Sequence, residues 1–63
     1  MTKVGEKMME YLAARERSIK KSLDIYEANT AVSTMLSYGL TEVQGAIDLL
    51  YTLEGIENNK NNG

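Results

Sequence analysis

The acidic side chains are the leading candidates for acid–base chemistry in this sequence, because its 63 residues include no His and no Cys. Glu54 and Glu57 lie close together near the end of the chain, and Asp48 interrupts an apolar segment. A carboxyl group acts as a general acid or base when burial or a like charge moves its pKa toward neutrality. The pattern places these three on a solvated helix face or beside a helix end. It therefore predicts no catalytic residue, and we expect a protein that is not an enzyme.

The sequence also offers few ligands for a metal ion or a cofactor. Cys and His hold most protein-bound zinc, and carboxylates without them bind Ca²⁺ or Mg²⁺ in dedicated loops. We therefore expect no metal and no cofactor. A chain of 63 residues buries only about 60% of the surface of its unfolded form. Small domains add disulfides, metals or oligomerisation to become stable, and oligomerisation is the route that this composition leaves.

Four basic residues close together raise the alternative of nucleic-acid binding. They are Arg15, Arg17, Lys20 and Lys21. Phosphate contacts need such a surface, so RNA or DNA binding by the first helix is our second hypothesis. However, Glu16–Lys20 and Lys20–Asp24 have the spacing of ordinary helix-stabilising ion pairs, and the net charge is −2. We therefore favour a solvated helix face over a nucleic-acid site.

Three tyrosines and one leucine are candidate contacts for another protein. A Tyr side chain combines an apolar ring with a polar tip, which suits interfaces. Tyr11 and Tyr38 lie away from the main apolar stripes, whereas Leu49 and Tyr51 widen the stripe of the second predicted helix on its two flanks. The partner-binding hypothesis rests on these four residues. The alternative is that the rings cover part of the protomer's own core.

The strongest signal for the elements that carry these residues is a helix end at Gly39 followed at once by a helix start. Gly ends helices easily because it adopts the left-handed conformation. Thr41 and Gln44 have the spacing of a capping box, in which each side chain bonds the other residue's backbone N–H. We therefore expect a tight turn at Gly39-Leu40.

A second helix is predicted after this turn, from about residue 42 to residue 54, because apolar residues recur there at helical spacing. They are Val43, Ala46, Ile47, Leu50 and Leu53. Gly55 is the expected stop, and Ile56 is placed to fold back on Tyr51.

The first helical region covers about residues 4–38, and its apolar residues do not keep one phase. One side carries Met8, Leu12, Ile19, Leu23 and Tyr26, and the opposite side carries Ile25, Ala28, Val32, Met35 and Leu36. A break near Asn29-Thr30 would explain this, since both residues favour caps. We favour a continuous or kinked helix, because no Pro or Gly lies between Gly5 and Gly39. Its two faces would then need different neighbours, which indicates a bundle of several chains.

These observations predict an all-α helical hairpin that assembles with itself into an oligomeric bundle, as a dimer or a dimer of dimers. Residues 1–57 would be one domain and residues 58–63 a disordered tail. The expected function is that of a small regulator, adaptor or inhibitor acting by protein–protein contact, of the kind that phages and other mobile elements encode. The partners expected are a second copy and a larger protein. No apolar run is long enough to span a bilayer, so we expect no membrane partner and a cytoplasmic location.

Overall fold

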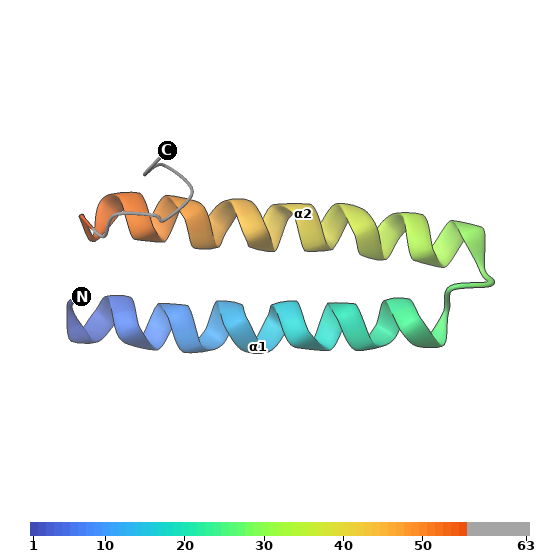
Figure 1. Ribbon diagram of the computed structural model, residues 1–63, viewed down its shortest axis with the longest axis horizontal. Helices are drawn as coiled ribbons and strands as arrows, with labels where there is room; N and C mark the ends of the chain where they lie inside the picture. Colours follow the sequence, from blue (N-terminus) through green and yellow to red (C-terminus); the bar gives the residue numbers. More distant parts are fainter. Residues whose placement is uncertain (56–63) are drawn as a thin grey trace, which may run out of the picture.

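Residues 1–55, which a computed structural model describes, form two helices that lie side by side and run in opposite directions (Figure 1). α1 spans Lys3–Ile25 and α2 spans Thr30–Leu53. The described residues contain no strand, so the prediction of an all-α helical hairpin is confirmed. The tail predicted over residues 58–63 and the contact predicted for Ile56 lie outside the described residues.

The chain reverses at residues 26–29, and the predicted turn at Gly39-Leu40 is wrong. Both residues lie in the middle of α2. The Thr41 hydroxyl donates to the Ser37 carbonyl oxygen one turn earlier (3.0 Å), so it does not cap a new helix. A Gly inside a helix costs only about 1 kcal/mol relative to Ala. The packing of α2 along the whole of α1 outweighs that local preference.

Asn29 caps the start of α2 and stabilises the observed turn. The favoured prediction of a continuous helix over residues 4–38 is also wrong, because α1 ends at Ile25. The Asn29 side-chain oxygen accepts a hydrogen bond from the Val32 backbone N–H (3.1 Å). This bond satisfies one of the donors that the first turn of a helix leaves unpaired. The Asn29 backbone N–H donates to the Tyr26 carbonyl oxygen (2.9 Å) and closes the turn. The alternative of a break near Asn29-Thr30 is therefore the correct one.

The reversal explains why apolar residues change sides along the first part of the sequence. Leu12, Ile19 and Leu23 are partly buried on α1, and Val32 and Leu36 are partly buried on α2. A turn between the two sets brings them against each other, because α2 returns along α1 (Figure 1). The two apolar sides that looked opposed on one predicted continuous helix therefore face each other in the observed hairpin.

The two outer helix ends have distinct caps. At the start of α1 the Thr2 hydroxyl accepts from the Gly5 backbone N–H (3.0 Å). At the end of α2 the cap residue is Glu54, and Gly55 follows with a left-handed backbone (φ 70°). Gly is the residue that adopts this conformation without steric cost, so the predicted stop at Gly55 is confirmed.

The core between the helices is small. Val43 and Leu50 are the buried hydrophobic side chains among the described residues, with 7% and 5% of their surface exposed. Burying a side chain of this size stabilises the fold by about 1.5–3 kcal/mol, whereas ordering the backbone costs about 1–2 kcal/mol per residue. A single hairpin therefore has little buried apolar surface with which to offset that cost.

Candidate interaction surface

One side of the hairpin carries an open apolar groove between the two helices. Its volume is about 420 Å³, and it is lined by Lys7, Met8, Tyr11, Leu12, Ala46, Leu49, Leu50 and Leu53. We call this feature the apolar groove. Four of its lining side chains stay largely in solvent: Leu53, Tyr11, Leu49 and Met8 are 72%, 62%, 57% and 49% exposed. Exposed apolar side chains gathered in one patch are characteristic of surfaces that contact another molecule.

The groove brings together two of the four residues predicted to bind a partner. Tyr11 comes from α1 and Leu49 from α2, and they line opposite walls. The other two are placed differently. Tyr38 is 71% exposed and lies eleven residues before Leu49, about three helical turns away on the same side of α2. Tyr51 is partly buried and, at two residues from Leu49, points to roughly the opposite side of the helix.

A cation holds the Tyr11 ring at the edge of the groove. The guanidinium carbon of Arg15 lies 5.9 Å from the centroid of this ring. That distance is within the range of a cation–π interaction. Four residues separate the two side chains, so one turn of α1 places them next to each other. Arg15 is therefore on the groove side of the hairpin.

Three of the four basic residues of the nucleic-acid hypothesis, Arg17, Lys20 and Lys21, share one side of α1 by helical spacing, and Arg15 lies apart against Tyr11. Arg17 lines a hollow together with Glu6 and Glu10. Of the two predicted ion pairs, Glu16–Lys20 is the one seen (3.9 Å). Acidic residues lie among these cations, so this side of α1 is mixed in charge.

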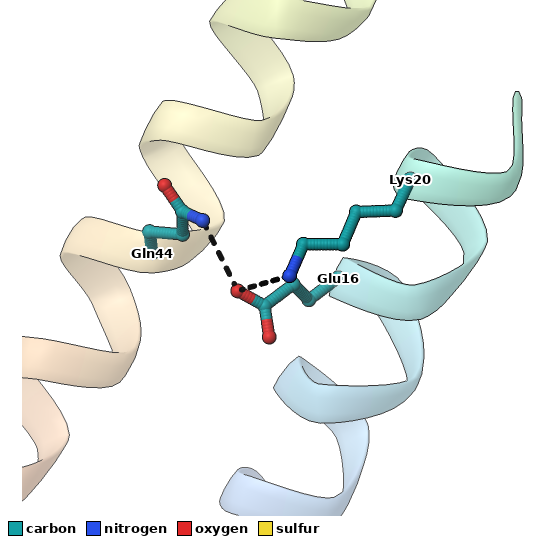
Figure 2. A network of polar contacts seen from close by, with 3 residues as sticks. All are labelled: Glu16, Lys20 and Gln44. Carbon is teal, nitrogen blue, oxygen red and sulfur yellow. Dashed lines mark hydrogen bonds and ion pairs between the residues drawn. The ribbon is translucent and has the colours of Figure 1, made fainter. Parts of the chain in front are cut away.

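The side of the hairpin away from the groove carries a polar contact between the two helices. The Gln44 side-chain amide of α2 donates to Glu16 Oε2 of α1 (3.2 Å), and the same oxygen forms an ion pair with the Lys20 ammonium (3.9 Å; Figure 2). One carboxylate thus ties the helices together and binds a cation. The two sides of the hairpin therefore differ: one carries a polar cluster beside a hollow lined by Glu16, Gln44, Ile47 and Asp48, and the other leaves apolar side chains in solvent.

Glu54, a candidate for acid–base chemistry, has a structural environment instead. Its Oε1 accepts both the Thr2 backbone N–H (2.7 Å) and the Thr2 hydroxyl (2.7 Å). These hydrogen bonds favour the charged carboxylate and lower the pKa of Glu54 below its ordinary value. A general acid or base working near neutral pH needs a shift in the other direction. Asp48 is exposed, and Glu57 lies outside the described residues.

Sequence reasoning missed Met8 and Leu53 as surface residues. Both were placed on the apolar stripes, Met8 on the first predicted helix and Leu53 on the second. With the turn at residues 26–29, both line the apolar groove toward the free ends of the helices. The signal that could have placed them is the seven-residue repeat of each helix, which becomes readable only once the turn is known.

Comparison of the chain with models of protein families, with curated proteins and with solved structures finds no match in any of the three. No helix within residues 1–55 has the length and hydrophobicity to cross a bilayer. In the same residues, no three acidic side chains come close enough to hold a metal ion.

Proposed function

We propose that this protein is a small non-enzymatic regulator, adaptor or inhibitor that acts by protein–protein contact as a homo-oligomeric helical bundle. The observation that carries the proposal is the apolar groove, with Tyr11 and Leu49 on its walls. A groove lined by apolar side chains on a water-exposed hairpin gains free energy when another protein surface covers it. Tyr38, exposed further along α2, extends the surface available to a protein partner.

The small core supports the same proposal. Two buried hydrophobic side chains are few for two helices of 23 and 24 residues. Helices of this length owe most of their stability to packing of an apolar face. Association supplies that packing without disulfides, which a chain without Cys does not form.

The first experiment is the solution mass by light scattering across a dilution series. The proposal expects a dimer or larger assembly that persists to low micromolar concentration. A folded monomer over the whole series would contradict the homo-oligomeric part of the proposal.

The second experiment tests the contact surface. In-cell crosslinking is carried out with the wild-type chain and with the Tyr11→Ala, Tyr38→Ala double variant, and Lys21→Ala serves as an exposed control. The wild-type chain and Lys21→Ala should form the same crosslinked products. The double variant should lose the crosslink between copies or the crosslink to another protein. If it loses neither, the assigned surface is wrong. If the affinity of the chain for its partner decreases steeply as the salt concentration rises, the partner is a nucleic acid, because phosphate contacts release counterions.

A further inference from the structure

The apolar groove continues into a second hollow along the same side of the hairpin. Tyr11 lines both. The second hollow is more polar, because Arg15, Ser18 and Ser22 line it beside Ile19 and Leu36. One strip therefore runs from Leu53, at the free ends of the helices, toward the turn, and it is apolar at the end near Leu53 and mixed further along. The strip extends along most of the length of the hairpin. The surface that covers it best is therefore an elongated helical surface.

The residues that line this strip, together with those beside them where the two helices meet, repeat with the spacing of a helical bundle. On α1 they step by three and four residues through Met8, Leu12, Arg15, Ile19, Ser22 and Tyr26. On α2 they step in the same way through Val32, Leu36, Gly39, Val43, Ala46 and Leu50. Alternation of three and four is the repeat of helices that pack on more than one neighbour at shallow angles.

The observed pairing of the helices puts these two series in register. The Glu16–Gln44 hydrogen bond (3.2 Å) fixes the level of α2 against the middle of α1. A Cβ atom on Gly39 would lie 3.8 Å from Ile19 Cδ1, so these two residues are level with each other. Counting outward from that contact, Leu12 is level with Ala46. In both layers a large side chain lies opposite a small one. The Leu12–Ala46 layer borders the apolar groove, where a large side chain of a second hairpin has room to enter.

We infer that the occupant of the strip is a second copy of this chain, related by a twofold axis parallel to the helices, with α1 of each copy packed on α2 of the other. The inference rests on the proposed self-assembly and adds its geometry. Charge decides between the two ways of placing the axis. Arg15 is on the groove side, and Glu42 is on the same side because it precedes Ala46 and Leu49 by four and seven residues.

With the axis parallel to the helices, Arg15 of one copy lies level with residue 43 of the other copy, next to Glu42. The twofold axis makes two such Arg15–Glu42 pairs in the dimer. With the axis perpendicular to the helices, α1 packs on α1 and α2 on α2. Arg15 then meets Arg15, and Glu42 meets Glu42, near the middle of the bundle. Like charges across an interface disfavour that arrangement, whereas opposite charges fix the first one.

The test is charge exchange between copies, read as the dissociation constant by sedimentation at low salt. Arg15→Glu and Glu42→Arg alone should each weaken the dimer by about tenfold or more, because each places two like-charged pairs in the interface. An equimolar mixture of the two variants should form a heterodimer of near wild-type affinity, since both of its pairs are again opposite in charge. Lys21→Glu, an exposed charge reversal on α1, should leave the dissociation constant unchanged.

Rescue by mixing separates contact between copies from any effect within one hairpin. Circular dichroism of each single variant at high concentration checks that the helices still form. A wild-type dimer that neither variant weakens, or variants that mixing does not rescue, would overturn the arrangement and leave the proposed assembly standing. A wild-type chain that stays monomeric at tens of micromolar would overturn both.

Discussion

The Thr2 hydroxyl donates to the Glu54 carboxylate over 2.7 Å while accepting from the Gly5 backbone N–H over 3.0 Å. One hydroxyl therefore caps the start of α1 and ties it to Glu54, the cap residue that follows α2. The approach is so close that a Cβ atom on Gly5 would collide with the Glu54 carboxylate and come within 2.9 Å of Met1 Cγ. The absence of a side chain at Gly5 leaves room for the Glu54 carboxylate at this position.

This contact should make stability depend on acid pH. Hydrogen bonds from Thr2 lower the pKa of Glu54 in the folded state, so the unfolded chain binds more protons in the acid range. Stability should therefore be complete above the ordinary Glu pKa of about 4.3 and decrease as the pH falls through the lower folded value. Glu54→Gln should flatten this part of the profile, measured by urea denaturation at a series of pH values.

Glu10→Gln is the matched control, because it removes one exposed carboxylate from α1 and leaves the Thr2 contact in place. It should keep the acid dependence of the wild-type chain. If Glu54→Gln and Glu10→Gln gave the same profile, the Thr2–Glu54 contact would not be the source.

The cap at Asn29 should be worth a measurable part of the stability. Asn29→Ala removes the acceptor for the Val32 backbone N–H and should lower the free energy of unfolding by about 1 kcal/mol. Asn29→Asp keeps an acceptor at the same position and should retain most of the stability. A continuous helix through this residue makes the opposite prediction, since Ala is the better helix former. Urea denaturation at one fixed protein concentration distinguishes the two.

The sequence was sufficient to predict two apolar helices, the stop at Gly55 and the exposure of Tyr11 and Tyr38. It was insufficient to choose between Gly39 and Asn29 as the place of the turn. Both carry genuine local signals, a potential left-handed stop at one and a side-chain cap at the other. The choice depends on which turn gives helices of equal length that pack along their whole extent, and local propensity does not contain that information.

The candidate surface depended on the same choice. Tyr11 and Leu49 were identified because they lie beside the apolar stripes, but nothing local showed that they line one groove. Moving the turn by about ten residues changes which positions of α1 and α2 are level with each other. Tyr51 was grouped with them because it flanks the same stripe as Leu49. The opposite flank is the one on which Gln44 and Glu16 form a hydrogen bond.

Two glycines in α2 give a direct test of the turn. Gly39→Ala should stabilise the chain by about 0.5–1 kcal/mol, because Gly is a poor helix former and the added Cβ meets Ile19 at an ordinary 3.8 Å. Gly45→Ala is the reference, since nothing lies within 4 Å of its Cβ position, and it should stabilise by a similar amount. A turn at Gly39 with a left-handed backbone would instead make Gly39→Ala destabilising. The comparison is made by thermal unfolding of both variants at the same concentration.

Leu50 and Leu53 should respond differently to truncation if another copy covers the groove. Leu50 is 5% exposed within one hairpin, so Leu50→Ala should cost about 2–5 kcal/mol at every protein concentration. Leu53 is 72% exposed, and in an isolated hairpin Leu53→Ala should change stability by less than about 0.5 kcal/mol. In an assembly, Leu53→Ala removes apolar surface from the contact between copies and raises the dissociation constant. The variant should therefore melt below the wild-type chain at concentrations where the wild-type chain is assembled, and the two melting temperatures should converge on dilution. Melting curves of Leu53→Ala, Leu50→Ala and the wild-type chain over a hundredfold dilution measure this difference. Equal melting temperatures for Leu53→Ala and the wild-type chain at every concentration would show that the end of the groove near Leu53 stays in water.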